Sequence, residues 1–69
     1  MEISEIQLRF TYHKPTEKKI EDYGTIRSSA ENFANRLNQL CPESREKSLA
    51  ITKLEEVVMW ANASIARRE

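Results

Sequence analysis

The sequence has almost none of the residues that staple a small protein or bind a structural metal. Cys41 is the one cysteine and His13 the one histidine, so neither an intrachain disulfide nor a four-ligand zinc site can form. Below about 70 residues, a single core rarely supplies more than about 3–5 kcal/mol of stability. For this chain of 69 residues we expect one domain, in a reducing compartment, that gains stability by self-association.

An excess of one charge and a long apolar run are also missing. Eleven basic and eleven acidic residues cancel, six against six up to Pro42 and five against five beyond it, which predicts no attraction to polymeric nucleic acid or an anionic membrane. No apolar run approaches the ~18 residues of a membrane span. The beginning, MEISEIQLRF, lacks the basic and apolar regions of a signal peptide. These absences predict a cytosolic protein.

One glycine and two prolines leave few points at which the chain can turn. Pro15 and Pro42 divide it into three segments, because each disfavours helical geometry at the residue before it. The first segment, about residues 2–10, fits a short helix only loosely. The alternation of Ile6, Leu8 and Phe10 suits a strand equally well. We expect the short helix.

The remaining two segments have helical periodicity. We expect helices over about residues 16–41 and 44–67, with Thr16 and Ser44 as N-caps. Gly24 costs the first of them roughly 1 kcal/mol relative to alanine, so the helix bends there or something approaches its backbone closely. The apolar positions at intervals of three and four are Ile20, Tyr23, Ile26, Ala30, Phe33, Leu37 and Leu40, then Ile51, Leu54, Val58, Ala61 and Ile65. The predicted fold is all-α, one domain over 1–69, dominated by an antiparallel helical hairpin.

Further apolar residues lie off this seam, on other sides of the last helix. They are Leu49, Val57, Met59 and Trp60. A helix that is apolar on more than one side is buried on more than one side, and in a two-helix hairpin only another chain can cover the second side. We therefore expect a homo-oligomer larger than a dimer, with VVMWANASIA in the contact.

Catalytic constellations have little to draw on. A nucleophile, a base and an orienting group would all have to be assembled around the single His13. Cys41, beside Pro42, suits a small buried hydrophobe. Glu55 and Glu56 are adjacent on a helix, so they point in different directions and do not form an acid–base pair. The sequence predicts neither an enzyme nor a cofactor or metal site.

The segment FTYHKPTEK is the one concentration of possible binding groups. In the plainer interpretation Tyr12 packs against the hairpin while His13 and Lys14 face water. In the functional one, an aromatic ring with nearby cations before a helix N-terminus stacks on a base and holds a phosphate. Arg27 would add a guanidinium, or simply pair with Glu31 one turn on. The residues alone go no further than a candidate nucleotide or phosphate site on a small helical oligomer.

Four stretches in order, YHKP, IR, PESREKSLA and LEEVVMWANASIAR, carry a resemblance that covers the chain from Phe10 to Glu69. They resemble the small phage anti-CBASS proteins that act as cyclic-oligonucleotide sponges, the second type described. The resemblance implies a compact helical homohexamer in the host cell cytoplasm. It would sequester, without cleavage, cyclic dinucleotides such as 3′,3′-cGAMP between pairs of protomers. Cyclic trinucleotides would bind separately, at three-protomer contacts.

The resemblance also implies roles for particular residues. Tyr12 corresponds to the base-stacking tyrosine, with His13 and Lys14 beside it in the dinucleotide site. Arg27 stands where the family has a basic residue, often lysine, that contacts the phosphates. Arg67 corresponds to the arginine of the trinucleotide site, although Arg68 is adjacent. The alternative from another class is a structural or adaptor protein, a hairpin whose exposed apolar side binds a protein partner.

Overall fold

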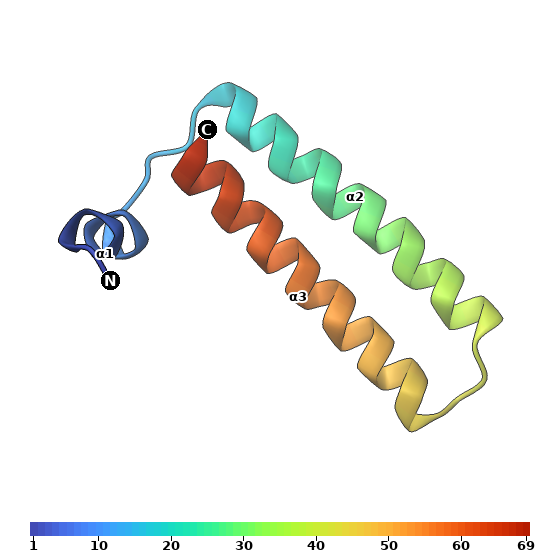
Figure 1. The fold of residues 1–69 in the computed structure, drawn as a ribbon. Helices are drawn as coiled ribbons and strands as arrows, with labels where there is room; N and C mark the ends of the chain where they lie inside the picture. Colours follow the sequence, from blue (N-terminus) through green and yellow to red (C-terminus); the bar gives the residue numbers. More distant parts are fainter.

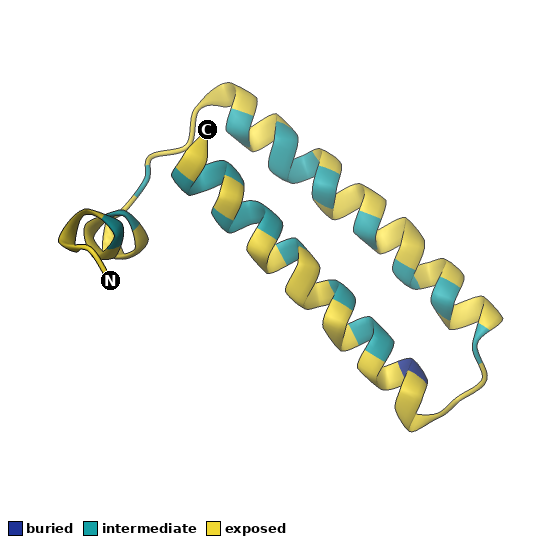
Figure 2. Ribbon diagram, in the orientation of Figure 1, coloured by how far each residue is buried: buried dark blue, intermediate teal, exposed yellow.

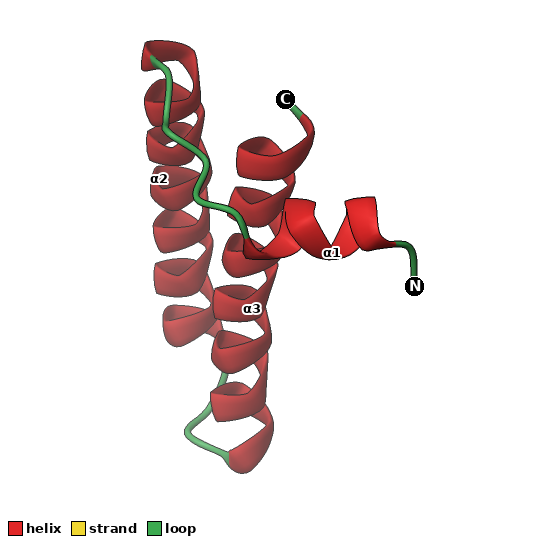
Figure 3. Cartoon of the chain, turned by 90° about the vertical axis from the view of Figure 1, so that its left-hand side faces the viewer, coloured by secondary structure: helices red, strands yellow, loops and turns green.

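A computed structural model describes all of residues 1–69, which form three α-helices and no strand. The helices are α1 (Ile3–Phe10), α2 (Glu17–Leu40) and α3 (Arg45–Arg68). Helices α2 and α3 lie side by side as an antiparallel hairpin, and α1 projects sideways from it near the end of α3 (Figures 1 and 3). The predicted all-α class is confirmed, and the first segment is a helix rather than a strand.

Both long helices begin at the caps that the sequence predicts. The Thr16 hydroxyl accepts a hydrogen bond from the Lys19 backbone N–H at 3.2 Å, and the Ser44 hydroxyl accepts one from that of Lys47 at 3.1 Å. Each cap satisfies a donor that the first helical turn would otherwise leave without a partner. α2 continues through Gly24 as one helix without a positive φ angle.

The lysines of these two first turns also join the helices to each other. Lys19 Nζ donates to the Ala66 carbonyl at 3.3 Å, near the end of α3. In the same way Lys47 Nζ donates to the Asn38 carbonyl near the end of α2 at 3.1 Å, and it pairs with Glu43 at 2.5 Å. Carbonyls at a helix C-terminus carry partial negative charge, so each ammonium stabilises the opposite helix. The sequence shows no repeat, yet the two ends of the hairpin are closed by equivalent contacts.

The hairpin has no buried apolar core. Lys47, 9% exposed, is the one buried residue (Figure 2). The α2–α3 seam consists of half-buried side chains: Tyr23, Ile26, Ala30, Ala34 and Leu37 on α2, and Ile51, Leu54, Val58, Ala61 and Ile65 on α3. A hairpin with so little burial retains only a small part of the hydrophobic stabilisation available to a domain of this length.

Three residues assigned to the seam from periodicity lie outside it. Ile20, Phe33 and Leu40 are 57%, 52% and 74% exposed, so their predicted place in the contact is wrong. The apolar residues of α2 form a stripe that is wider than the surface covered by one neighbouring helix. These three residues lie at the edges of that apolar stripe, beyond the reach of α3. Cys41 is free and half-buried rather than fully buried.

The apolar residues placed off the seam are exposed in the single chain. Their exposed fractions run from 43% for Leu49 to 65% for Trp60, with Val57 and Met59 between them. Large apolar side chains exposed on more than one side of a helix indicate that other surfaces cover them. None of the three helices combines the length and apolar character that crossing a bilayer requires.

Gly24→Ala is expected to stabilise the protein. A Cβ at this position would meet only the Arg27 Nη2 atom, at 3.9 Å, which is ordinary van der Waals contact. Alanine lowers the free energy of the helix by roughly 1 kcal/mol relative to glycine, or about 4–8 °C in unfolding temperature for a domain of this size. Thermal unfolding followed by circular dichroism, at matched protein concentration, measures this shift. A lower unfolding temperature would mean that something outside the chain occupies the space beside Gly24.

Candidate functional site

The linker between α1 and α2 presents Tyr12 and Lys14 to solvent. Tyr12 is 81% exposed, which excludes its packing against the hairpin within one chain. His13 is half-buried, and its Nε2 lies 2.7 Å from the Leu8 carbonyl oxygen. Because a carbonyl only accepts hydrogen bonds, Nε2 carries the proton and His13 fixes the linker against the end of α1. The ring and the ammonium are therefore available to a ligand, while one nitrogen of the imidazole is already bonded.

Arg27 lies on a different part of the molecule. It is about ten residues, roughly 15 Å, along α2 from the first residue of the helix, and it is exposed. It forms no ion pair with Glu31, the partner expected one turn on. Within one chain, Tyr12 and Arg27 thus stand on separate elements.

An open groove of about 330 Å³ runs between α2 and α3 beside Arg27. We call it the hairpin groove. Its floor is apolar, and the charged residues on it are Arg27, Glu31 and Glu55. The other lining residues are Ala30, Ala34, Ile51, Leu54, Val58 and Met59. The groove thus offers one guanidinium group, with two carboxylates nearby, above an apolar floor. This arrangement suits a ligand or a neighbouring chain that places a negative group against Arg27.

A second groove, of about 690 Å³, lies between α1 and α3 and contains Arg67. We call it the arginine groove. Three guanidinium groups line it, those of Arg9, Arg67 and Arg68, together with the rings of Phe10 and Trp60. The remaining lining residues are Met1, Ala63 and Ser64. Guanidinium groups beside exposed aromatic faces are the combination that binds phosphates and stacks on bases.

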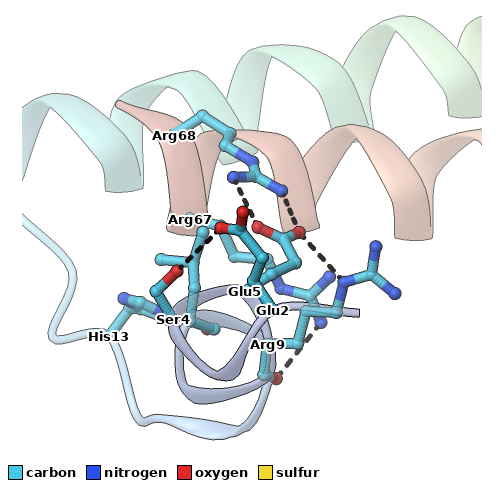
Figure 4. A network of polar contacts seen from close by, with 8 residues as sticks. Glu2, Ser4, Glu5, Arg9, His13, Arg67 and Arg68 are labelled. Carbon is cyan, nitrogen blue, oxygen red and sulfur yellow. Dashed lines mark hydrogen bonds and ion pairs between the residues drawn. The ribbon is translucent and has the colours of Figure 1, made fainter.

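Polar contacts connect α1 to the end of α3 at this groove (Figure 4). Arg68 donates to both carboxylate oxygens of Glu5, at 2.6 and 3.4 Å, and Arg9 Nε donates to the same carboxylate at 3.0 Å. These hydrogen bonds, from Arg68 first and then Arg9, hold the pKa of the Glu5 carboxyl below its ordinary value. The Glu5 carboxylate in turn raises the pKa of Arg68.

Arg67 differs from the adjacent Arg68 in the group to which it is hydrogen-bonded. Its Nη2 donates a long hydrogen bond, 3.5 Å, to the backbone carbonyl of Arg9, and it contacts no carboxylate. Its charge is therefore not neutralised by an ion pair, whereas Arg68 is occupied by Glu5. Of the two adjacent arginines, Arg67 is the one that is free to receive an anion without first losing a partner.

Three members of the arginine groove, Arg9, Phe10 and Trp60, were not among the residues predicted from the sequence to bind a ligand. Trp60 could have been found, because it precedes Ala63, Ser64 and Arg67 at the helical intervals that place all four on one side of α3. The two α1 residues had no such signal, since only the docking of α1 brings them to the groove.

In its architecture this is a small all-α protein built on a two-helix hairpin, with a cationic and aromatic groove at one end. The chain belongs to the Acb2/Tad1 hairpin-domain family, whose family model matches residues 2–66. This is the family of the anti-CBASS sponges and the related Tad1 proteins, so the resemblance noted from the sequence is confirmed. Comparison with curated proteins and with solved structures gave no match.

Proposed function

We propose that the protein is a phage immune-evasion sponge that sequesters the cyclic dinucleotide and cyclic trinucleotide messengers of bacterial CBASS immunity without cleaving them. The observation that carries this proposal is the match to the anti-CBASS sponge family over nearly the whole chain, residues 2–66. The arginine groove and the exposed Tyr12 supply the two chemistries that cyclic oligonucleotides require, which are guanidinium groups for phosphates and aromatic faces for bases.

The trinucleotide site is assigned to Arg67. A cyclic trinucleotide has approximate three-fold symmetry, and three copies of the chain around a three-fold axis would offer each phosphate one arginine. Arg67 supports this role because its guanidinium has no carboxylate partner, and because it shares the arginine groove with the exposed Trp60 ring. The small residues Ala63 and Ser64 beside it allow neighbouring copies to approach closely.

The dinucleotide site is assigned to Tyr12 and Arg27, with His13 and Lys14 beside the tyrosine. The separation of Tyr12 and Arg27 within one chain supports a pocket shared by two copies, each presenting the same groups to a ligand of two-fold symmetry. Two stacked bases at about 1–3 kcal/mol each, with two charged hydrogen bonds at about 1.5–3 kcal/mol each, amount to roughly 5–12 kcal/mol. The middle of that range corresponds to about micromolar affinity.

Binding without hydrolysis is part of the proposal. The one histidine hydrogen-bonds only to the Leu8 carbonyl, so no nucleophile and no carboxylate is paired with it, as a catalytic base toward a phosphodiester would require. A sponge needs only affinity, and the groups described here supply affinity.

Assembly into a homo-oligomer, preferably a hexamer, completes the proposal. No apolar side chain of the single chain is buried, and the exposed apolar residues of α3 need a covering surface. Other copies of the chain would provide it, and would form the shared pockets at the same time.

Calorimetry with a panel of cyclic dinucleotides and cyclic trinucleotides tests the function directly. We expect saturable binding of both classes, and recovery of the intact nucleotide after the protein is denatured. Recovery of linear nucleotides would show a phosphodiesterase instead. If no cyclic nucleotide binds, the exposed apolar residues of α3 favour the adaptor alternative, in which a protein partner covers them.

Tyr12→Ala is expected to weaken binding of 3′,3′-linked cyclic dinucleotides by about 1–3 kcal/mol per stacked base, because the aromatic face is lost. Tyr12→Phe should lose far less, since it keeps the ring and removes only the hydroxyl. Calorimetry on the parent and the two variants measures both effects. Equal affinity of the alanine variant and the parent would mean that the exposed ring packs in the assembly and does not contact the ligand.

A further inference from the structure

The Glu5 carboxylate bridges two of the arginines that line the arginine groove. It accepts hydrogen bonds from Arg68 through both oxygens, the shorter at 2.6 Å, and from Arg9 at 3.0 Å (Figure 4). Arg9 and Arg68 are two of the three arginines that line the groove. Two of the three guanidinium groups of the groove are therefore already bonded to an anion that the chain itself supplies.

The way Glu5 is held matches the way a phosphate is held. A guanidinium presents two parallel N–H groups that fit two oxygens of one anion, whether these belong to a carboxylate or to a phosphodiester. A phosphodiester placed between Arg68 and Arg9 would satisfy the same donors. Both anions cannot occupy the position together, because like charges at that distance repel.

The contact is also weak enough to exchange. Glu5, Arg9 and Arg68 are all partly or largely solvent-accessible, and ion pairs of this kind contribute little to stability. No residue of α1 is buried and Leu8 is its one half-buried apolar residue, so displacing Glu5 disturbs little apolar packing. Arg67, in contrast, has only a carbonyl partner and keeps its charge throughout.

We propose that Glu5 is an internal competitor for the ligand's phosphates: it occupies Arg68 and Arg9 in the free protein and yields them to a polyanionic phosphate ligand, thereby setting the affinity and charge selectivity of the arginine groove. Arg67 makes the first contact with the ligand, and Arg68 and Arg9 are recruited when Glu5 leaves. Ligands with a single weak charge do not displace it. The identity of the natural ligand rests on the proposed function, whereas the exchange of anions does not.

The test compares Glu5→Gln with Glu2→Gln. Both remove one negative charge from the same end of the chain, but Glu2 accepts only from the Ser4 hydroxyl, at 3.5 Å, and contacts no arginine. The probes are cyclic tri-AMP and inorganic trimetaphosphate, a ring of phosphates without bases. Calorimetry measures both, and Trp60, the only tryptophan, reports binding in the groove by its fluorescence. Circular dichroism first establishes that each variant keeps its helices.

Glu5→Gln is expected to bind both probes about three- to tenfold more tightly than the parent, and Glu2→Gln less than about twofold more tightly. The gain should disappear when Arg68→Gln is added, because the competition acts through that guanidinium. Equal gains in the two glutamine variants, or a gain that survives Arg68→Gln, would mean that net charge alone is responsible and would overturn the proposal. Absence of trimetaphosphate binding in both the parent and Glu5→Gln would also overturn it.

The two proposals fail separately. If cyclic tri-AMP binds no variant while Glu5→Gln still gains affinity for trimetaphosphate, the trinucleotide part of the proposed function is wrong and the competitor stands. A second measurement needs no variant: the pKa of the Glu5 carboxyl, followed by carbon NMR on the parent, should rise toward its ordinary value when trimetaphosphate is bound, because the carboxylate loses Arg68 and Arg9. An unchanged pKa at saturation would show that Glu5 stays in place.

Discussion

Val57→Glu is expected to dissociate the assembly into chains of 8.1 kDa. Val57 is 60% exposed in the single chain and lines neither groove, so its expected role is contact with a neighbouring copy. Burying a valine side chain contributes about 1.5–3 kcal/mol, and burying an unpaired carboxylate in its place is strongly unfavourable. A loss of about 3 kcal/mol at each contact lowers the association constant more than 100-fold. Light scattering at micromolar concentration measures the mass.

Thr52→Glu is the matched control for this substitution. It places the same carboxylate on α3, at an exposed position on a different side of the helix from Val57. We expect this variant to keep the mass of the parent. Dissociation of both variants would place the contact elsewhere, and a parent protein that is itself an 8.1 kDa monomer would contradict both the assembly and the shared pockets.

Arg67→Ala is expected to abolish binding of cyclic trinucleotides and leave binding of cyclic dinucleotides intact, whereas Arg27→Ala should do the reverse. The two arginines lie in separate grooves without a lining residue in common. A charged hydrogen bond contributes about 1.5–3 kcal/mol, and the loss of one from each of three copies lowers the affinity by at least about 1,000-fold. Calorimetry of each variant with both ligand classes measures the separation.

Arg36→Ala provides the control, because Arg36 is an exposed arginine of α2 that lines neither groove. It should bind both ligand classes as the parent does. The two-site assignment is wrong if saturating dinucleotide blocks the trinucleotide in a competition titration. Loss of both ligands from Arg67→Ala or Arg27→Ala, with the oligomer intact, would contradict it equally.

Local signals in the sequence predicted the secondary structure well. The caps at Thr16 and Ser44 depend on one side chain and a backbone group three residues on, so nothing distant can change them. The width of the α2–α3 contact is not determined by local sequence. Periodicity predicted which side of α2 faces α3. It did not predict how much of that side α3 covers, and for this reason Ile20 and Leu40 remain exposed.

The candidate site likewise has one part that local sequence predicts and one part that it does not. Arg67 and Trp60 share one side of α3, a relation that helical spacing alone contains. The arrival of Arg9 and Phe10 in the same groove depends on how α1 docks, and the pairing of Glu5 with Arg68 joins residues from opposite ends of the chain. No spacing rule predicts such contacts, because the hydrogen bonds that join α1 to α3 are made by Arg67 and Arg68, about 60 residues along the chain from their partners.

A lysine of each long helix donates to a carbonyl near the end of the other helix, so the two ends of the hairpin are closed in the same way. These contacts do not depend on which of the two helices comes first in the chain. The start of α2 and the end of α3 lie side by side, where Lys18 pairs with Glu69 and Lys19 donates to Ala66. In a chain without residues 1–15, a peptide link from Glu69 to Thr16 and an opening at Pro42 would place α3 before α2, with the same residues available for the Lys19–Ala66 and Lys47–Asn38 contacts. The native order of the helices is therefore not required by the contacts that close the two ends. It determines instead which end of a molecule 45 Å long carries α1 and the Tyr12 linker, and that is the end where Arg67 lies.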